Sequence, residues 1–401
     1  MNKGAGKVGW AVHKIGDVAA VFDGPHATPK TVEAGPVFLG IGALQDGTIN
    51  LGETRHVTAE DFQRWTRRVR PQANDIVFSY ETKLGEAAII PEGFDCCLGR
   101  RMGLVRLDER RVVPRFFLYQ YISPLFHNFL SDRTIRGATV DRISIREFPS
   151  FPIAVPPLLE QQRIVGILDE AFDGIAAAKA NAEKNLQNAR ALFESHLHAV
   201  FTQRGEGWVE KPLGDTCEVK DGTHYSPTYV ADGIPFVTQK NVKENGLSLE
   251  DTKFISQVDH DGFYKRSNVA CGDILISMIG ANRGMACIVD DSRVFSIKNV
   301  GLVKKSDTID HRFLLYFLKS SMAAAYVRSK SKGGAQEFIG LTELRKFPIL
   351  ITTLPRQKAI VAKLEILRQE TEHLESLYRQ KLAALDALKK SLLDQAFTGV
   401  L

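Results

Sequence analysis

Residues 158–202 read LLEQQRIVGILDEAFDGIAAAKANAEKNLQNARALFESHLHAVFT. Apolar or small side chains recur along this stretch at alternating steps of three and four residues, the spacing that keeps one stripe of a helix against a partner helix. The stretch contains no proline, and a helix over most of it would be roughly 60 Å long, far longer than an average globular helix. We therefore predict one long helix with a coiled-coil stripe, in which Lys179 and His196 are polar members. The main apolar members of the stripe are Val165, Leu168, Phe172, Ile175, Leu186 and Phe193.

A second stretch of the same kind covers residues 354–398. A shift of 196 positions takes Gln161 to Gln357 and Phe201 to Phe397, and each stretch follows a Phe-Pro pair, where the residue before proline resists helix formation. Two helices of one length in one chain are natural partners, and we expect them to pack antiparallel. The stripe of the second helix contains Leu364, Leu367, Leu374, Tyr378, Leu385, Leu388 and Leu392.

The rest of the chain is also duplicated. A shift of 198 positions takes Asp23-Gly24 to Asp221-Gly222 and Asp75-Ile76 to Asp273-Ile274, and the offset drifts by only two residues before the long helices. We therefore predict two globular domains, residues 1–157 and 206–353. Each is followed by a long helix, in residues 158–203 and 354–401.

Each globular domain has the sequence pattern of short strands separated by turns. Residues 75–79 and 273–277 are short apolar runs of the buried-strand type, and Asp46-Gly47 and Asn245-Gly246 signal tight turns at matched positions. Residues 115–130 and 312–327 have helical spacing. The predicted fold class is therefore α+β. Two mixed, mainly β domains are separated by two long helices in an antiparallel coiled coil, as a pseudo-two-fold tandem repeat.

Composition sets the broad class. The chain has 401 residues, of which 44% are hydrophobic and 25% charged, as in an ordinary globular protein. The net charge of +5 is compatible with nucleic acid as a partner but does not require it. No run approaches a membrane span, residues 1–10 lack the apolar core of a signal peptide, and the five cysteines show no C-x-x-C spacing. We expect a reduced, cytoplasmic protein without a zinc site.

The sequence shows no catalytic constellation. The G-x-G-x-x-G pattern at residues 4–9 has no strand before it, and neither a phosphate-binding G-x-x-x-x-G-K-[ST] loop nor an H-E-x-x-H pair occurs. Asp75, Glu81 and Lys83 faintly resemble a nuclease cluster, but the second copy has no counterpart. His26 and His224 recur without a nucleophile–base pattern beside them. We expect a chain that binds rather than catalyses, with no metal or cofactor of its own.

Loops rich in Arg, Lys, Asn and Gln occupy corresponding places in both copies. Arg, Asn and Gln side chains can each bond two atoms of a base edge, and Lys or Arg neutralises phosphate, whereas such clusters taken singly are more often solvated loops. The candidate DNA-contacting residues are Lys83, Arg133, Arg136, Thr139, Arg142, His224, Tyr225, Gln239, Lys240, Asn241, Asn282, Arg283, Lys330, Lys332 and Gln336.

Four motifs together resemble the specificity subunit of type I restriction–modification systems, over essentially the whole chain. They are DGTHYSP at residues 221–227, GDILIS at 272–277, GGAQ at 333–336 and PPLLEQQRIV at 156–165. The second long helix begins with PRQKAI at residues 355–360, which lacks the glutamate, and Asp23-Gly-Pro-His26 replaces Asp-Gly-Thr-His in the first copy.

The resemblance implies a non-catalytic subunit with two target-recognition domains that reads a split DNA sequence. It also implies two adenine-methyltransferase subunits and, in the full complex, two ATP-dependent translocating endonuclease subunits as partners. S-adenosylmethionine, ATP and Mg would be bound by those partners. The alternative is a coiled-coil scaffold that joins two ligand-binding modules without DNA. A stand-alone nuclease or methyltransferase would need a catalytic motif, which we do not find.

The arrangement of the repeats carries its own expectation. A second helix that returns antiparallel along the first gives two similar domains at a fixed separation, which suits two half-sites about one helical turn of DNA apart. Because the candidate loops differ between the copies, the two half-sites should differ too. As a hypothesis, the length of the helices sets the unread spacer between them.

Overall fold

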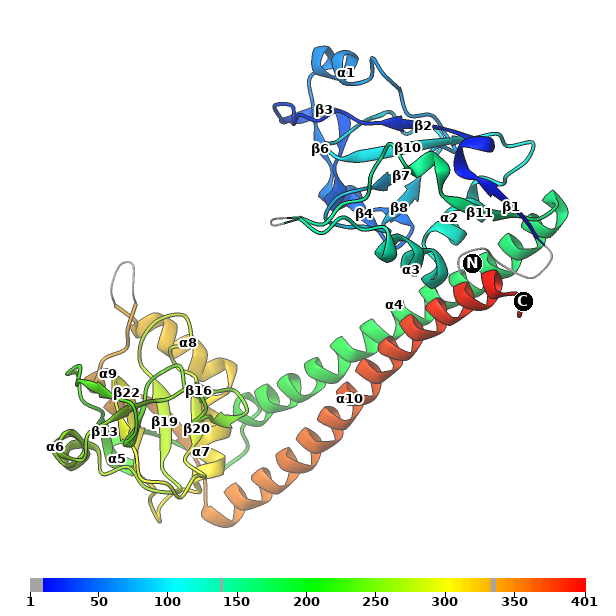
Figure 1. Cartoon of the computed structure of the whole chain (residues 1–401). Coiled ribbons are helices and arrows are strands. Elements are labelled where there is room, and N and C mark those ends of the chain that lie inside the picture. Colours follow the sequence, from blue (N-terminus) through cyan, green and yellow to red (C-terminus); the bar gives the residue numbers. More distant parts are fainter. Residues whose placement is uncertain (1–9, 138–139, 333–336) are drawn as a thin grey trace. The chain divides into compact units, whose positions relative to one another are not determined.

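The computed structural model describes residues 10–137, 140–332 and 337–401. The chain divides into two compact units (Figure 1). Unit 1 comprises residues 1–183 and 380–401, and unit 2 comprises residues 184–379. The long helices α4 (Leu158–Thr202) and α10 (Leu354–Thr398) each contribute to both units, and each has 45 residues. The glycine pattern at residues 4–9, Thr139 and Gln336 lie outside the described residues.

Unit 1 is built on an antiparallel sheet with the strand order β2-β10-β7-β8. These strands are β2 (Ala19–Asp23), β10 (Met102–Leu107), β7 (Ile76–Ser79) and β8 (Ala87–Ile89). A second sheet contains β6 (Arg55–His56), β3 (Val32–Leu39) and β9 (Cys96–Leu98), beside helix α1 (Ala59–Trp65). Two ladders complete the unit: the hairpin β4 (Leu44–Gln45) to β5 (Thr48–Ile49), and β1 (Ala11–Lys14) paired with β11 (Pro152–Val155).

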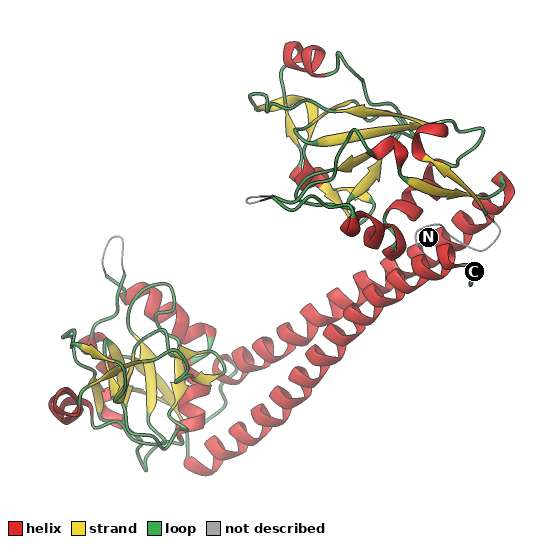
Figure 2. Cartoon of the chain, viewed as in Figure 1, coloured by secondary structure: helices red, strands yellow, loops and turns green. Residues whose placement is uncertain are grey.

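Unit 2 repeats this plan of short strands with flanking helices (Figure 2). Its central sheet has the order β13-β22-β19-β20. Its strands are β13 (Val219–Asp221), β22 (Val300–Val303), β19 (Ile274–Ser277) and β20 (Ala286–Ile288). The second sheet contains β14 (Tyr229–Val230), β18 (Lys253–Ile255), β15 (Ile234–Val237) and β21 (Ser296–Ile297), beside α6 (Gln257–Ser267). The hairpin β16 (Val242–Lys243) to β17 (Gly246–Leu247) and the pair β12 (Val209–Pro212) and β23 (Pro348–Ile351) follow, with short helices α5 (Leu213–Thr216) and α9 (Leu341–Arg345). The predicted tandem α+β repeat is confirmed.

The helical spacing of residues 115–130 corresponds to two short helices rather than to one continuous helix. Helix α2 (Pro114–Tyr121) ends before Ser123, whose hydroxyl caps α3 (Pro124–Asp132) by accepting a bond from the backbone of Phe126. In unit 2, Ser320 separates α7 (His311–Leu318) from α8 (Ser321–Lys330) in the same way. A serine cap satisfies the free amides of a new helix, and Pro124 cannot donate to the preceding turn.

Helices α2 and α7 join each sheet to the long helices. Phe117 and Tyr121 of α2 belong to the core beneath the sheet, whereas Phe116 and Tyr119 belong to a second core that contains residues of α4 and α10. Tyr119 donates to Asp169 of α4, and Arg115 pairs with the same carboxylate at 2.9 Å. Because α2 is buried on both sides, it is apolar around most of its circumference.

Within each unit the two long helices run antiparallel. In unit 1, Ile164 and Leu168 pack with Ala396 and Phe397, and Lys179 pairs with Asp386 at 2.6 Å. In unit 2, Phe201 packs in one core with Leu364, and Arg190 pairs with Glu375 at 3.0 Å. Early residues of α4 therefore meet late residues of α10, and late residues of α4 meet early ones.

The buried stripe of the helices departs from the prediction near their C-terminal ends. In α4 the buried positions Leu168, Ile175, Ala182 and Ala189 recur every seven residues, but His196 is exposed and its neighbour Leu197 is buried. In α10, Leu388 is 46% exposed, so its assignment to the stripe is wrong. Lys389 lies there instead, with its ammonium 5.2 Å from the centre of the Phe172 ring. An α-helix has 3.6 residues per turn, so a strict seven-residue repeat drifts around it and shifts the contact by one residue.

The other stripe residues are buried or half-buried, namely Val165, Phe172, Leu186, Phe193, Leu364, Leu367, Leu374, Tyr378, Leu385 and Leu392.

A buried carboxylate precedes the central strand of each sheet. Asp75 accepts bonds from the backbone of Gln72 at 2.8 Å and from Arg106 at 2.6 and 2.8 Å. Asp273 accepts equivalent bonds from Ala270 at 2.8 Å and from Lys304 at 2.5 Å. A buried charge requires such partners, which accounts for the recurrence of Asp75 and Asp273 in the sequence.

A buried glutamine in the first turn of each long helix fixes where the helix leaves its sheet domain. In α4, Gln161 accepts from the amide of Val113 at 2.8 Å and donates to the carbonyls of Arg111 and Pro156 at 2.9 and 2.8 Å. In α10, Gln357 accepts from Asp310 at 2.8 Å and donates to Thr352 at 2.7 Å. Both side chains are almost completely buried.

We expect Gln357→Ala to lower the free energy of unfolding of unit 2 by about 2–4 kcal/mol, because two partly buried backbone groups lose their hydrogen-bond partner. Urea denaturation of the full chain measures this loss. Gln187→Ala, which removes an exposed glutamine from α4, is the matched control. A loss no larger than that of Gln187→Ala would show that the buried amide does not hold the helix.

Candidate functional site

The topology brings the candidate loops of each unit to one end of its central sheet. Neighbouring strands are antiparallel, so the end of β13, the start of β22, the end of β19 and the start of β20 share one end. At this end Thr223 forms an isolated β-bridge with Lys298, and Ile279 forms one with Phe338. We call it the loop end of unit 2, and the corresponding end of the β2-β10-β7-β8 sheet the loop end of unit 1.

A hairpin loop is fixed at the loop end of each unit by a reciprocal pair of backbone hydrogen bonds. In unit 1 the amide of Ile135 donates to Arg142 at 2.8 Å, and the amide of Arg142 donates back at 3.1 Å. In unit 2, Lys332 and Phe338 exchange the same bonds at 2.9 and 2.8 Å. Each hairpin also pairs with the segment after the central strand, through Glu81 in unit 1 and Ile279 in unit 2. The two copies therefore hold different sequences in the same frame.

The recurrent histidines occupy equivalent positions at the two loop ends. The Nε2 atom of His224 lies 3.1 Å from the Asp221 carboxylate, and its Nδ1 atom lies 2.7 Å from the side-chain oxygen of Asn299. His26 contacts Asp23 at 2.7 Å and Arg101 at 3.1 Å. The His224 side chain is held by two partners and is still 58% exposed, so it can meet a ligand in a fixed orientation.

Ten predicted contact residues are exposed: Lys83, Arg133, Arg136, Arg142, His224, Tyr225, Lys240, Asn282, Lys330 and Lys332. Arg133 and Lys330 stand at equivalent helix ends, over the rings of Phe129 and Tyr326 at 5.3 and 5.9 Å. Tyr225 is 78% exposed. These side chains provide cationic groups and one aromatic ring to the solvent.

The prediction that Asn241 contacts a ligand is wrong. The side chain is 6% exposed, its oxygen accepts from the amide of Thr238 at 2.9 Å, and its nitrogen donates to the carbonyl of Ser248 at 3.0 Å. Both ends of the amide are therefore used to hold the β16–β17 hairpin.

Three of the predicted contact residues differ in how many of their polar atoms are already bonded within the protein. Arg283 donates to Ser331 and to Gly280 and pairs with Glu337, so it braces the hairpin of unit 2. The Lys83 ammonium is exposed but donates to the carbonyls of Gly42 and Leu44 at 3.1 and 3.4 Å. Gln239 lies half-buried beside Gly280, and its side-chain oxygen has no hydrogen-bond partner among the described residues.

The structure adds residues that the sequence analysis missed. Arg101 and Asn299 adopt positive φ angles of 64° and 52° in the turns before β10 and β22, where each contacts the recurrent histidine. The shift of 198 positions relates them, so the duplication itself was the signal that could have found them. Lys298 lies beside Asn299 and bonds Ser226, and Phe338 is 46% exposed at the base of its hairpin.

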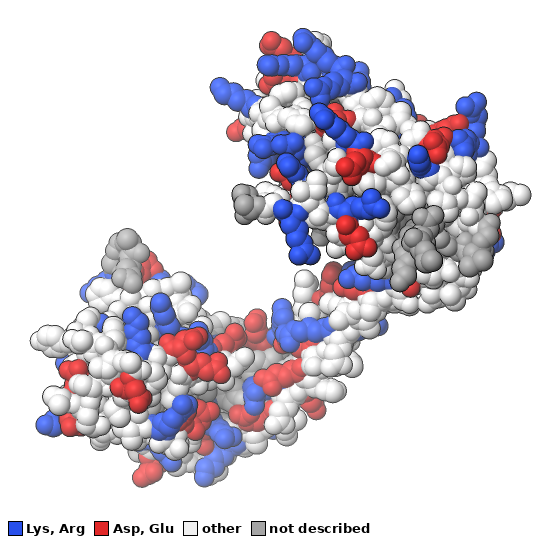
Figure 3. Space-filling view, in the orientation of Figure 1, with Lys and Arg blue, Asp and Glu red and all other residues white. Residues whose placement is uncertain are grey.

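The distribution of charge differs between the units. On the face shown in Figure 3, Lys and Arg gather over unit 1, whereas in unit 2 they are interspersed with Asp and Glu. A surface on which Lys and Arg gather favours an anionic partner.

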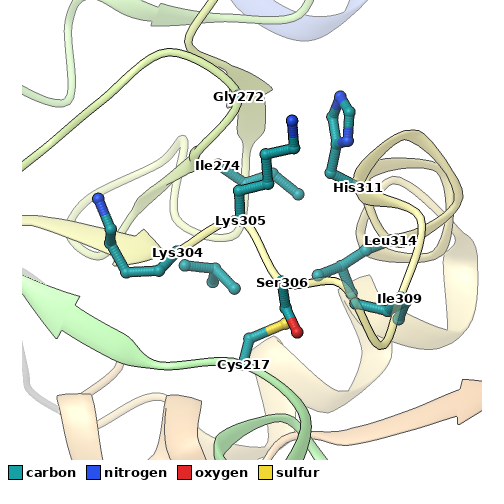
Figure 4. A pocket seen from close by; sticks show the side chains of 10 residues that line it. Cys217, Gly272, Ile274, Lys304, Lys305, Ser306, Ile309, His311 and Leu314 are labelled. Atoms are coloured by element: carbon teal, nitrogen blue, oxygen red, sulfur yellow. The ribbon is translucent and has the colours of Figure 1, made fainter.

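A narrow pocket of unit 2 lies at the other end of the central sheet from the loop end (Figure 4). The side chains of Lys305 and His311 project from its walls, and Cys217 lies beside Ser306. Burial raises the pKa of the Cys217 thiol to about 11 and lowers the pKa of His311. A thiol that stays protonated at neutral pH is a poor nucleophile, so Cys217 is not activated in this pocket.

Within residues 10–137, 140–332 and 337–401, no group of three His, Cys, Asp or Glu side chains is arranged to hold a metal ion. A search of the same residues finds no helix with the length and apolar character needed to cross a membrane.

Comparison with known proteins identifies relatives along most of the chain. The family model described as type I restriction modification DNA specificity domain matches twice, at residues 7–187 and 205–382. The type I restriction enzyme EcoBI specificity subunit of Escherichia coli is 24% identical over 334 residues, which are 76% of this chain and 69% of that protein. The MjaVIII specificity subunit of Methanocaldococcus jannaschii is 22% identical over 97% of this chain and 92% of its own length.

A solved structure from work on complex assembly and conformational transition of the type I restriction–modification system has a similar fold. It covers 99% of both chains with a TM-score of 0.78 and 19% identity.

We expect Asn241→Ala to lower the free energy of unfolding of unit 2 by about 2–3 kcal/mol, because the Thr238 amide and the Ser248 carbonyl lose a buried partner. The matched control, Asn282→Ala, removes an exposed amide and should change stability by less than about 0.5 kcal/mol. Thermal unfolding of both variants tests the assignment. Equal stabilities would contradict a structural role for Asn241.

Proposed function

The chain belongs to the type I restriction modification DNA specificity family, and from this premise we propose that it reads a split, asymmetric DNA sequence, one half with each loop end. The observation that carries the proposal is the pair of equivalent hairpins held by the same backbone bonds at Ile135–Arg142 and Lys332–Phe338. Hairpins held by the same backbone bonds suit the same function in both units. The different side chains that they carry suit different DNA sequences.

The two loop ends present different chemistry to DNA. Unit 1 offers the guanidinium groups of Arg136 and Arg142, with Arg101 fixed beside His26. Unit 2 places Phe338 where unit 1 has Arg142, and it adds the exposed ring of Tyr225 and the ammonium of Lys240. Arginine is the commonest reader of guanine, whereas aromatic side chains contact thymine methyl groups or stack on bases. Two unlike half-sites follow.

We further propose that the reactive chemistry belongs to partner subunits: two adenine methyltransferases and, in the complete complex, two ATP-dependent translocating endonucleases. Exposed apolar side chains on the helices of unit 2 support a protein partner there, since Leu192, Ile366 and Leu377 are 51%, 58% and 49% exposed. S-adenosylmethionine, ATP and Mg would be bound by those partners, and we propose that the complex acts on DNA in the cytoplasm.

A scaffold that joins two modules without DNA accounts for the duplication but not for matched cationic loops at both loop ends. The two functions separate by salt dependence. DNA binding through several phosphates should weaken steeply with ionic strength, and a scaffold has no such dependence.

The direct test co-expresses the chain with an adenine methyltransferase from the same gene cluster and maps methylated adenines in the host genome. We expect a split, asymmetric motif that appears only when both proteins are present. Arg136→Gln should relax one half of the motif and Lys240→Gln the other, because each cation belongs to one loop end. Arg110→Gln, which removes an exposed arginine paired with Asp108, should leave the motif unchanged. A motif that persists without the chain would refute the proposal.

Helix length should set the unread spacer between the half-sites. We expect seven residues inserted after both Glu183 and Arg379 to lengthen each helix by about 10 Å and the spacer by about three base pairs. The same methylation mapping measures the spacer. An insertion of seven residues in the Gln203–Gly207 linker, which lies outside both helices, should leave it unchanged. A spacer that does not respond to the helical insertions would exclude this role.

A further inference from the structure

Arg283 of unit 2 occupies a site made for a guanidinium group. Its Nε atom donates to the Ser331 hydroxyl at 2.8 Å, one terminal nitrogen donates to the Gly280 carbonyl at 3.1 Å, and another pairs with the Glu337 carboxylate. The side chain is 18% exposed. A hydroxyl, a carbonyl and a carboxylate thus accept bonds from one planar cation.

Unit 1 has leucine at the position of Arg283. The amide of Glu86 donates to Lys83 as the amide of Met285 donates to Asn282, so these two turns correspond. The glycines that follow, Gly85 and Gly284, have the same positive φ of 88°. The residue directly before this glycine is Leu84 in unit 1 and Arg283 in unit 2.

The acceptors around the missing guanidinium are retained. Thr134 corresponds to Ser331, because each hydroxyl donates to the carbonyl four residues earlier in its helix, at 2.8 and 2.6 Å. Asp141 corresponds to Glu337, because its carbonyl accepts from Thr82 at 3.1 Å as Glu337 accepts from Gly280 at 2.9 Å. Unit 1 therefore has the carboxylate and the hydroxyl but has leucine in place of the arginine.

Among the described residues, no side chain fills the space left by the shorter side chain. A hollow of about 320 Å³ is lined by Thr82, Leu84, Thr134 and Asp141, with His127 and Arg136 at its walls. Among the described residues, no cationic side chain pairs with the Asp141 carboxylate. The volume suits a small polar group, and the exposed carboxylate of Asp141 beside the apolar side chain of Leu84 suits a cation with an apolar stem.

We propose that this hollow is a binding site for an alkylguanidinium group, namely an arginine side chain supplied by a partner protein. The apolar stem of such a group would lie against Leu84, and its planar head would bond Asp141 and Thr134 as the head of Arg283 bonds Glu337 and Ser331. Guanidinium presents five donors in a fixed fork, whereas an ammonium is a compact point charge, so the site should prefer arginine to lysine. The assignment needs no DNA and does not depend on the proposed function.

Arg136 opposes the bound cation, because it carries the same charge at the wall of the hollow. Its replacement by glutamine should therefore tighten binding. This sets the occupant apart from a phosphate or carboxylate, whose binding the same substitution would weaken.

The test measures thermal unfolding of the full chain without DNA, with methylguanidinium as the probe and methylammonium as the control. Relative to Asp141→Asn, we expect methylguanidinium at saturating millimolar concentrations to raise the midpoint for wild type by about 2–4 °C. Methylammonium should produce less than half of that difference. Leu84→Arg should raise the midpoint without any ligand and abolish the response, because its own side chain fills the site, whereas Leu84→Met should retain the response.

The converse substitution keeps the proposal open to refutation if a unit 1 variant fails to fold. Arg283→Leu should lower the midpoint of unit 2, and methylguanidinium should restore part of the loss. Equal responses of wild type and Asp141→Asn would overturn the assignment. A response to deoxyguanosine but not to methylguanidinium would make the hollow a nucleobase site and would equally overturn it.

Discussion

The buried amide in the first turn of each long helix is the constraint on which the arrangement of each unit depends. Gln161 and Gln357 are satisfied by backbone groups of the sheet domain, from Val113 and Arg111 in one unit and from Asp310 in the other. Leaving such groups unpaired in the interior is costly, so the helix can begin in only one orientation relative to its sheet. Helices α2 and α7 then pack between the sheet and the helix pair and extend the contact with aromatic side chains.

The long helices are anchored at one end of each sheet, and the loop end at the other end can differ in sequence between the units. The loop ends are held by backbone bonds at Ile135–Arg142 and Lys332–Phe338, and backbone bonds do not depend on the side chains that the loop carries. The substitution of Arg142 by Phe338 between the copies illustrates this freedom. The two units also differ at Leu84 and Arg283. In unit 2 the guanidinium of Arg283 is hydrogen-bonded at this position, whereas in unit 1 Leu84 lies beside a hollow.

The helices, the repeat and the central strands could be predicted from the sequence, because periodicity and duplication are visible without long-range contacts. The break at Ser123 was missed, since a cap interrupts a helix without disturbing its apolar spacing. Leu388 was misplaced because a constant step pattern ignores helical drift. Asn241 and Arg283 looked like free donors, and their partners Ser248, Ser331 and Glu337 are set by the fold rather than by any local pattern.

The division of the chain also affects the order in which it can fold during synthesis. Unit 2 is one continuous segment, residues 184–379, whereas unit 1 joins residues 1–183 to residues 380–401. The core of unit 1 that contains Phe116 and Leu168 is incomplete until Phe397 has left the ribosome. At about 5–20 residues per second, this leaves the apolar face of α2 and α4 uncovered for roughly 10–45 seconds. The domain that is synthesised first is therefore the last to be completed.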